Sequence, residues 1–358
     1  MKRILAGQFM KEYALVAENL YMMIMKDLGN LKMCYVEDVL GKHSDHELAW
    51  MFLVDGCATL QFMHCFENYE KFRRMNITDE LVVFATQDIL LLENQLPYAL
   101  LELLISSVVQ KTEQEIIRYS IDKFISGCNI FLTERLSAKK LREVPTCHLL
   151  GLLRQATGVD FKAENKARPF ITGDSPTFHS ATQLTVSGIR FKPFYEASLE
   201  ISFKRGFWGI LRLPPVIVDE SLFLPMFLSL ASYEKCPDFL NGKEVTSYIW
   251  FLDSLIQHPD DVKVLREAGI LINFFGSEEE IAELFKMVAK DLVPNPDLYS
   301  NLRFEIEVHY KKKWRPRIYQ LIKVSQDYWT MLKVGAFITI FFTVVQTYFA
   351  LPLHKSKT

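Results

Sequence analysis

The side chains that could bind a metal are scattered along this chain. Its six cysteines form no C-x-x-C pair: Cys34, Cys57, Cys65, Cys128, Cys147 and Cys236. Cys57, His64 and Cys65 are the only local group of soft ligands, and a structural zinc site needs four converging donors. Scattered thiols are instead typical of small apolar core residues in a reducing compartment. We therefore predict no metal and no cofactor.

Motifs of the common enzyme classes are also missing from the sequence. It contains no G-x-S-x-G, G-x-G-x-x-G, Walker A or H-E-x-x-H pattern. The stretch HSDHELAW brings His43, His46 and Glu47 together, but it lacks two histidines four residues apart, so we expect a polar loop. We predict that the protein is not an enzyme. The alternative is an unrecognised Cys or Ser hydrolase, because a triad assembled in space leaves no local trace.

A polar triplet interrupts the apolar run DILLLENQLPYALLELL. Pro97 lacks an N–H and clashes with the carbonyl of Glu93, so we expect a kink near Leu96 and a second helix from Pro97. Asn94 and Gln95 carry donors and acceptors that can satisfy the backbone groups freed there. Glu93 can accept from amides of the helix that follows. Its alternative role as a catalytic carboxylate lacks a partner acid, nucleophile or metal motif.

Composition bounds the classes of protein to which the chain can belong. It has 358 residues, of which 49% are hydrophobic and 23% are charged, with a net charge of -2. These values exclude disorder and allow a large core. The near-neutral charge gives no global field that favours nucleic acid, and we predict no nucleic-acid partner.

The first 157 residues are predicted to form a helical lobe, beginning with an amphipathic helix. Apolar residues recur there every three or four positions: Leu5, Phe9, Tyr13, Val16 and Leu20. Gln8, Lys11 and Glu12 interrupt the run too early for a signal peptide. Residues 158–180, rich in Gly, Pro and charge without periodicity, are predicted to be a linker.

A second lobe is predicted over residues 181–326, with short strands followed by helices. Leu199, Ile201 and Phe203 alternate with polar residues, as in a half-buried strand. Pro214 and Pro215 restrict the next apolar segment to an edge or a bend. We expect these strands to form one small antiparallel sheet, which makes the fold mainly α with a small antiparallel β insert (α+β).

Two helix starts in the second lobe have local signals. Pro259 stands where a first helical turn tolerates proline, and Gly269 where a C-cap would lie. Ser277 and Glu280 have the spacing of a capping box ahead of an apolar stripe. We expect a helix to begin at each of these places.

Residues 327–358 are predicted to be a membrane anchor and tail. Val334 to Leu353 are 20 uncharged residues, which as a helix would span about 30 Å, the thickness of bilayer hydrocarbon. Cations cluster upstream, including the run KKKWRPR, so we expect a tail-anchored, single-pass protein whose bulk is cytosolic and whose last helix contacts membrane lipid. The alternative is a buried helix of a soluble protein.

Polar residues of this span share one helical face. Thr339, Thr343 and Gln346 could bond across helices, which would make the protein a homo-oligomer. The alternative is that the threonine hydroxyls bond to carbonyls of their own helix.

Ordered blocks along the chain resemble a known plant family. They are DILLLENQLPY, FLVDGC (Phe52–Cys57), HLLGLLR (His148–Arg154), SATQLTVSGIRFK (Ser180–Lys192), LSLASYEKC (Leu228–Cys236), SYIWFLDSLIQHPDDVKVLREAGILINFFGS (Ser247–Ser277) and VVQTYF. The chain is similar to the family called domain of unknown function 247, also labelled uncharacterised protein family 0481. Members usually begin with an extra segment containing an Ile-Gly-Pro-Tyr-His-like motif, so we expect this first lobe to be shorter than theirs.

The resemblance implies a plant membrane protein without an assigned reaction. Members are typically single-pass membrane proteins with no established catalytic residues, and some grass members are linked to pollen-side self-incompatibility. It therefore implies recognition or signalling through an unknown protein partner. The same resemblance implies no cofactor and no metal.

Overall fold

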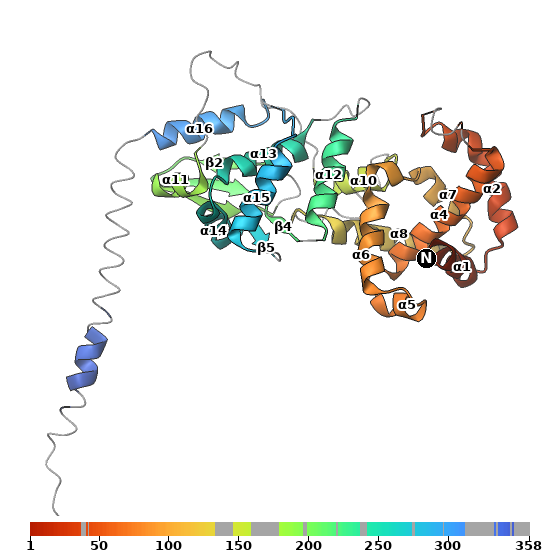
Figure 1. Cartoon of the computed structure of the whole chain (residues 1–358), viewed down its shortest axis with the longest axis horizontal. Coiled ribbons are helices and arrows are strands. Elements are labelled where there is room, and N and C mark those ends of the chain that lie inside the picture. Colours follow the sequence, from red (N-terminus) through yellow and green to blue (C-terminus); the bar gives the residue numbers. More distant parts are fainter. Residues whose placement is uncertain are drawn as a thin grey trace, which may run out of the picture.

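The computed structural model describes most of the chain between the first residue and residue 311, and a few residues beyond. The described residues are 1–36, 41, 43–132, 146–158, 179–195, 199–219, 221–236, 242–273, 276–295, 297–311, 333, 336–343 and 346. The predicted linker therefore lies outside them except at residues 158, 179 and 180. The body is elongated, with the first helices at one end and the strands toward the other (Figure 1).

The amino-terminal part is helical, as predicted. Its elements are α1 (Lys2–Glu12), α2 (Ala17–Lys32), α4 (Asp45–Cys65), α5 (Tyr69–Arg74), α6 (Asp79–Leu90), the 3-10 turn η1 (Leu92–Asn94), α7 (Tyr98–Ser106), α8 (Lys111–Cys128) and α10 (Leu149–Ala156). Helix α4 is its centre, because α1, α2, α7 and α8 all pack against it. A helix surrounded in this way must be apolar on most sides, and α4 buries residues all around its axis.

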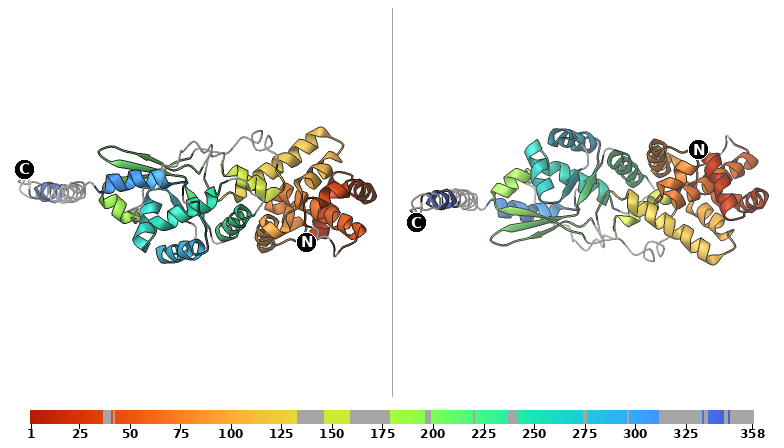
Figure 2. Two further views of the ribbon diagram at one scale, coloured as in Figure 1. Left: turned by 90° about the horizontal axis from the view of Figure 1, so that it is seen from above. Right: turned by 90° about the horizontal axis from the view of Figure 1, so that it is seen from below.

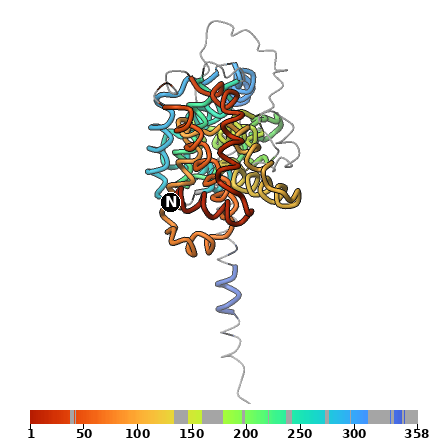
Figure 3. The backbone as a smooth tube through the Cα atoms, turned by 90° about the vertical axis from the view of Figure 1, so that its right-hand side faces the viewer, coloured from red at the N-terminus to blue at the C-terminus, as the bar shows by residue number. Residues whose placement is uncertain are grey.

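The predicted amphipathic helix at the start of the chain is two helices. The chain turns between α1 and α2, where Ala14 has φ +51. Leu5, Phe9 and Leu20 are buried, but Val16 at the turn is 52% exposed. The reversal lets both helices place an apolar face against α4, which one straight helix could not do. Figure 3 shows this end of the molecule nearest the viewer.

The second part combines helices with short strands. Its helices are α11 (Ala181–Val186), α12 (Phe223–Glu234), α13 (Glu244–Leu255), α14 (Pro259–Glu267), α15 (Glu278–Ala289) and α16 (Ser300–Tyr310). Its strands are β1 (Ile189–Pro193), β2 (Ser202–Lys204), β3 (Gly209–Leu213), β4 (Val216–Val218) and β5 (Leu271–Asn273). Both predicted helix starts are confirmed: Pro259 begins α14, and Ser277 with Glu280 forms the capping box of α15.

The strands do not form the single antiparallel sheet that we predicted. They form two sheets, one with the order β1-β3-β2 and one pairing β4 with β5. β1 and β4 each run parallel to their partner, and only β2 is antiparallel to β3. The bend at Pro214 and Pro215 separates β3 from β4. The partner of β4 is β5, which follows α14, so this pairing is decided by packing rather than by neighbouring sequence.

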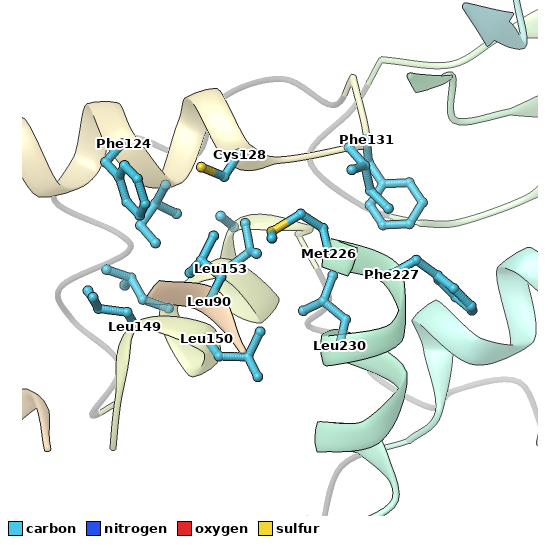
Figure 4. Close-up of a cluster of buried hydrophobic side chains, with 14 of the residues drawn as sticks. Leu90, Phe124, Cys128, Phe131, Leu149, Leu150, Leu153, Met226, Phe227 and Leu230 are labelled. Atoms are coloured by element: carbon cyan, nitrogen blue, oxygen red, sulfur yellow. The ribbon is translucent and has the colours of Figure 1, made fainter. Parts of the chain in front are cut away.

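The hydrophobic core continues from one part of the molecule into the other. Leu90 of α6, Phe124 of α8 and Leu153 of α10 converge with Met226 and Leu230 of α12 (Figure 4). Figure 2 shows α12 lying against the amino-terminal helices in both views. The boundary at residues 157/158 stays a prediction, but the core crosses it.

The prediction of a carboxyl-terminal transmembrane helix is overturned. Among the described residues, no helix is long and apolar enough to cross a bilayer. Residues 336–343 of the predicted span are helical. Most of Val334–Leu353 otherwise lies outside the described residues. The single-pass localisation derived from that span is overturned with it.

Two helical glycines should respond oppositely to alanine. A Cβ at Gly56 of α4 would stand 2.5 Å from Cδ1 of the buried Leu104, whereas a Cβ at Gly7 of α1 would meet nothing within 4 Å. Gly7→Ala should raise the free energy of unfolding by about 0.5–1 kcal/mol. Gly56→Ala should lower it by about 1 kcal/mol, because overpacking outweighs the gain in helix propensity. Urea unfolding measures both, and a gain at Gly56 would show that α4 and α7 have room between them.

Candidate functional site

The polar triplet lies at a corner between α6 and α7. α6 ends at Leu90, η1 follows, and α7 begins after Pro97. The Gln95 Nε2 donates to the carbonyls of Ile89 at 2.9 Å and Leu91 at 2.7 Å. The exposed Asn94 donates to the Asp88 carbonyl at 3.1 Å. The Gln95 amide thus gives the Ile89 carbonyl a donor, and it adds a second donor to the Leu91 carbonyl, which also accepts from the Asn94 backbone amide at 3.1 Å.

Gln95 also caps a helix that lies far away in the sequence. Its Oε1 accepts from the Leu150 amide at 2.9 Å, in the first turn of α10. The His148 Nδ1 accepts from the Gly151 amide at 3.0 Å in the same turn. The Tyr98 amide at the start of α7 donates to the Cys147 carbonyl at 2.8 Å, and Glu93 is exposed. The corner therefore fixes the start of α10. Its role is structural, because it joins α6 and α7 to α10.

A buried charge cluster joins α10 to α12 and α13. The Arg154 Nε donates to the Glu234 Oε1 at 2.8 Å, and its Nη2 donates to Glu244. Glu234 also accepts from the Val245 amide at 3.0 Å and the Thr246 amide at 2.9 Å. These amides belong to the first turn of α13, whose dipole favours a negative charge. Burial raises the pKa of Glu244 above its ordinary value.

The sequence did not predict this cluster, although two of its members lie in sequence blocks that resemble the plant family. Arg154 ends HLLGLLR and Glu234 lies within LSLASYEKC, each beside apolar residues. A charge within an apolar run is seldom buried without a partner, and that was the available signal. Which acid pairs with which cation could not be read from the chain, because the partners are 80 and 90 residues from Arg154.

Cys57, His64 and Cys65 all belong to α4, but each has its own contacts. Cys57 is buried, and burial raises its thiol pKa to about 12. The buried Cys65 accepts from the Gln61 amide at 3.4 Å. His64 lies 3.2 Å from Glu12 and 2.9 Å from the Lys71 ammonium. Within the described ranges, no group of three His, Cys, Asp or Glu residues could hold a metal ion.

The structure also brings a serine to His64. The Ser120 Oγ lies 3.3 Å from the His64 Nδ1, and Glu12 lies by the Nε2, so the three residue types of a hydrolytic triad meet. The Ser120 hydroxyl, however, donates to the Ile116 carbonyl at 3.0 Å. Burial and the adjacent Lys71 lower the pKa of His64. A neutral His64 that accepts from Lys71 through Nε2 carries its proton on Nδ1, so it cannot take one from Ser120.

An open aromatic hollow lies between α2 and α4. It has a volume of about 470 Å³ and is lined by Ala17, Glu18, Tyr21, Met22, His46 and Trp50. We name these six residues the α2–α4 hollow. His46, which we expected in a polar loop, is in the first turn of α4, where Ser44 and Glu47 form a capping box.

The rings of the hollow are held by their own contacts. The Tyr21 hydroxyl and the His46 Nδ1 are 2.6 Å apart, and the two rings stack with centroids at 6.4 Å. The Tyr21 and Trp50 rings are tilted by 57°, with centroids at 6.3 Å. Met22 is 66% exposed and Trp50 is 52% exposed. Sequence reasoning did not select this site, because its aromatic residues come from two helices.

The residues of the predicted oligomer face lie within the helical residues 336–343 and at position 346. The Thr343 hydroxyl donates to the Thr339 carbonyl at 2.8 Å, a bond within the same helix. This bond is the alternative to contacts across helices. A homo-oligomer formed through Thr339, Thr343 and Gln346 stays a prediction.

Comparison with known proteins decides the family. The profile of DUF247, described as "Plant protein of unknown function", matches residues 1–343. The chain belongs to the DUF247 family. The resemblance of its sequence blocks is thereby confirmed.

Two relatives of this DUF247 chain come from Arabidopsis thaliana. The UPF0481 protein At3g47200 is 28% identical over 331 residues, which cover 84% of this chain and 66% of the relative. The UPF0481 protein At3g02645 is 25% identical over 150 residues, which cover 41% of this chain and 28% of the relative. This chain thus spans about two thirds of the first relative's length. No solved structure matches it.

Replacing Gln95 should destabilise this DUF247 chain. Gln95→Met keeps most of the volume but removes the partner of the Ile89 carbonyl and of the Leu150 amide, whereas the Leu91 carbonyl keeps its bond from the Asn94 amide. Each such group costs about 1–3 kcal/mol where water cannot replace the bond, so we expect unfolding to require about 2–4 kcal/mol less. Asn94→Ala, which removes one exposed bond, should change stability by less than about 1 kcal/mol. Equal effects of the two substitutions in urea unfolding would contradict the role given to Gln95.

Acid should weaken the wild-type chain relative to a His148 variant. Burial lowers the pKa of His148, so below about pH 6.5 the unfolded chain binds a proton that the folded chain does not. The contribution of neutral His148 to the free energy of unfolding is therefore fully present above about pH 6.5 and is lost as the pH falls below it. His148→Asn removes the titration and keeps a good capping side chain. The free energy of unfolding of His148→Asn relative to wild type should rise by up to about 1.4 kcal/mol for each pH unit below about pH 6.5.

Urea unfolding of both chains at about pH 7.5 and 5.5 checks this expectation. Asp253 acts in the opposite sense, because burial raises its pKa to about 6 and the folded chain then gains stability as the pH falls. That contribution is common to wild type and variant, so it cancels in the comparison. A difference that stays constant with pH would contradict the prediction.

Proposed function

We propose that this DUF247 chain is a non-enzymatic recognition protein that binds a protein partner at the α2–α4 hollow. The observation that carries the proposal is the exposure of Trp50 and Met22 around an open aromatic depression. Tryptophan, tyrosine and methionine are enriched in the centres of protein interfaces, and large exposed apolar side chains mark such surfaces.

The scaffold beneath the hollow supports this role. α2 and α4 are packed on a continuous apolar core, with Leu20, Ile24 and Leu53 buried beneath the surface. The hydrogen bond between Tyr21 and His46 holds one ring in place before a partner arrives. A site with little side-chain freedom left to lose binds at a smaller entropic cost.

The alternative is a hydrolase, and the contact between Ser120 and His64 is the observation that supports it. Ser120 lies within hydrogen-bond distance of His64. A fluorophosphonate probe should leave the full chain unlabelled if the protein is non-enzymatic. Labelling that is lost in both Ser120→Ala and His64→Gln would favour the hydrolase.

Site-directed cross-linking tests the proposed recognition role. A photo-reactive benzoylphenylalanine at Met22 should form a discrete adduct with a plant protein, and unmodified full chain should compete for it. Trp50→Ala should compete at least about tenfold less well, as expected for an interface anchor worth more than 1 kcal/mol. The matched control is Phe84, which is 61% exposed on α6. Equal adducts at Met22 and Phe84, or full competition by Trp50→Ala, would contradict the proposal.

A further inference from the structure

Two of the tryptophans in the described part of the chain carry an arginine on the ring face. The Arg190 guanidinium carbon lies 4.6 Å from the centroid of the Trp208 ring. The Arg303 guanidinium carbon lies 4.1 Å from the centroid of the Trp250 ring. A guanidinium over an indole face is attracted by the ring quadrupole and stacks well on it.

Trp50 is the third described tryptophan, and no lysine or arginine among the described residues lies over its ring. Its ring borders the α2–α4 hollow, and Glu18 borders the same hollow. Within the described residues Glu18 forms no ion pair, whereas the nearby Asp45 is paired with Lys32 at 2.5 Å. The lining of the hollow thus contains both a half-exposed indole ring and a carboxylate.

We infer that the α2–α4 hollow receives an arginine side chain of the protein partner. The guanidinium would stack on Trp50, as Arg190 and Arg303 do on their tryptophans, and donate to Glu18. The methylene groups would lie against Met22 and Ala17. This inference rests on the proposed function and names the chemistry of the partner: a basic segment that presents an arginine.

The selectivity expected of such a site follows from its parts. The indole attracts the positive charge, and the carboxylate can accept two parallel N–H bonds from a guanidinium. Citrulline has nearly the same shape as arginine but carries no charge. A cation–π contact that is partly desolvated discriminates by about five- to thirtyfold, so citrulline should bind less well by that factor.

The test uses the full chain labelled with 5-fluorotryptophan, and Trp50→Phe identifies the Trp50 resonance in the 19F NMR spectrum. The probes are the capped peptides Gly-Gly-Arg-Gly-Gly and Gly-Gly-citrulline-Gly-Gly at about pH 7.5. The arginine peptide should shift the Trp50 resonance in a saturable way. The citrulline peptide should require at least about fivefold more peptide for the same shift.

Glu18→Gln provides the second measurement. It should weaken binding of the arginine peptide by about fivefold or more, since a hydrogen bond to a charged acceptor becomes one to a neutral acceptor. Glu279→Gln is the matched control, because Glu279 is an exposed acid in the first turn of α15, as Glu18 is in the first turn of α2. It should leave binding unchanged.

The outcomes separate this inference from the proposed function. If citrulline binds as well as arginine, or Glu18→Gln has no effect, the arginine assignment is wrong, and a Met22 adduct would leave the recognition role standing. If the arginine peptide binds as described but no competed adduct forms at Met22, the hollow binds arginine and the proposed function fails.

Discussion

The fold depends on the pairing of three buried charges, with Arg154 between Glu234 and Glu244. Each carboxylate loses its water on burial, and two carboxylates without the guanidinium would lie in a dry site with uncompensated charge. The three side chains come from α10, α12 and α13, so the two carboxylates share the guanidinium as a partner only when these helices are assembled. This requirement orients the amino-terminal helices relative to the part of the chain that contains the strands.

The same helices are also capped by residues outside them. α10 receives the Gln95 carbonyl oxygen at its first turn, and α13 receives the Glu234 carboxylate. Amides at the start of a helix have no partner within it, and here the partner comes from another element. The corner after α6 therefore binds the first turn of α10, and the charge cluster binds α10 through Arg154 near its last turn.

This arrangement leaves the other side of the amino-terminal helices available for binding. α4 is surrounded by α1, α2, α7 and α8 and acts as a rigid centre. The surface over α2 and α4 does not take part in holding the two parts of the molecule together. The proposed recognition role therefore uses aromatic side chains on a surface that does not join the two parts of the molecule.

The sequence by itself determined the features whose causes lie within a few residues. Periodicity predicted a helical first part, Pro97 predicted the start of a new helix at α7, and the spacing of Ser277 and Glu280 predicted the start of α15. The preceding helix, however, ends at Leu90 and not near Leu96. Local sterics and hydrogen bonds decide such features, so a single chain reveals them. The uncharged carboxyl-terminal run showed the limit of this reasoning, because its composition predicted a membrane span and no helix among the described residues is long and apolar enough for one.

Only the tertiary structure decided which distant groups meet. Arg154 and its acids, Gln95 and the start of α10, β4 and β5, and the rings of Tyr21 and Trp50 are joined by packing across many residues of chain. The energy of these contacts comes from burial and from the low dielectric of the interior, and both exist only after the chain has folded. For that reason the buried charge cluster and the α2–α4 hollow of this DUF247 chain were visible in space but not along the sequence.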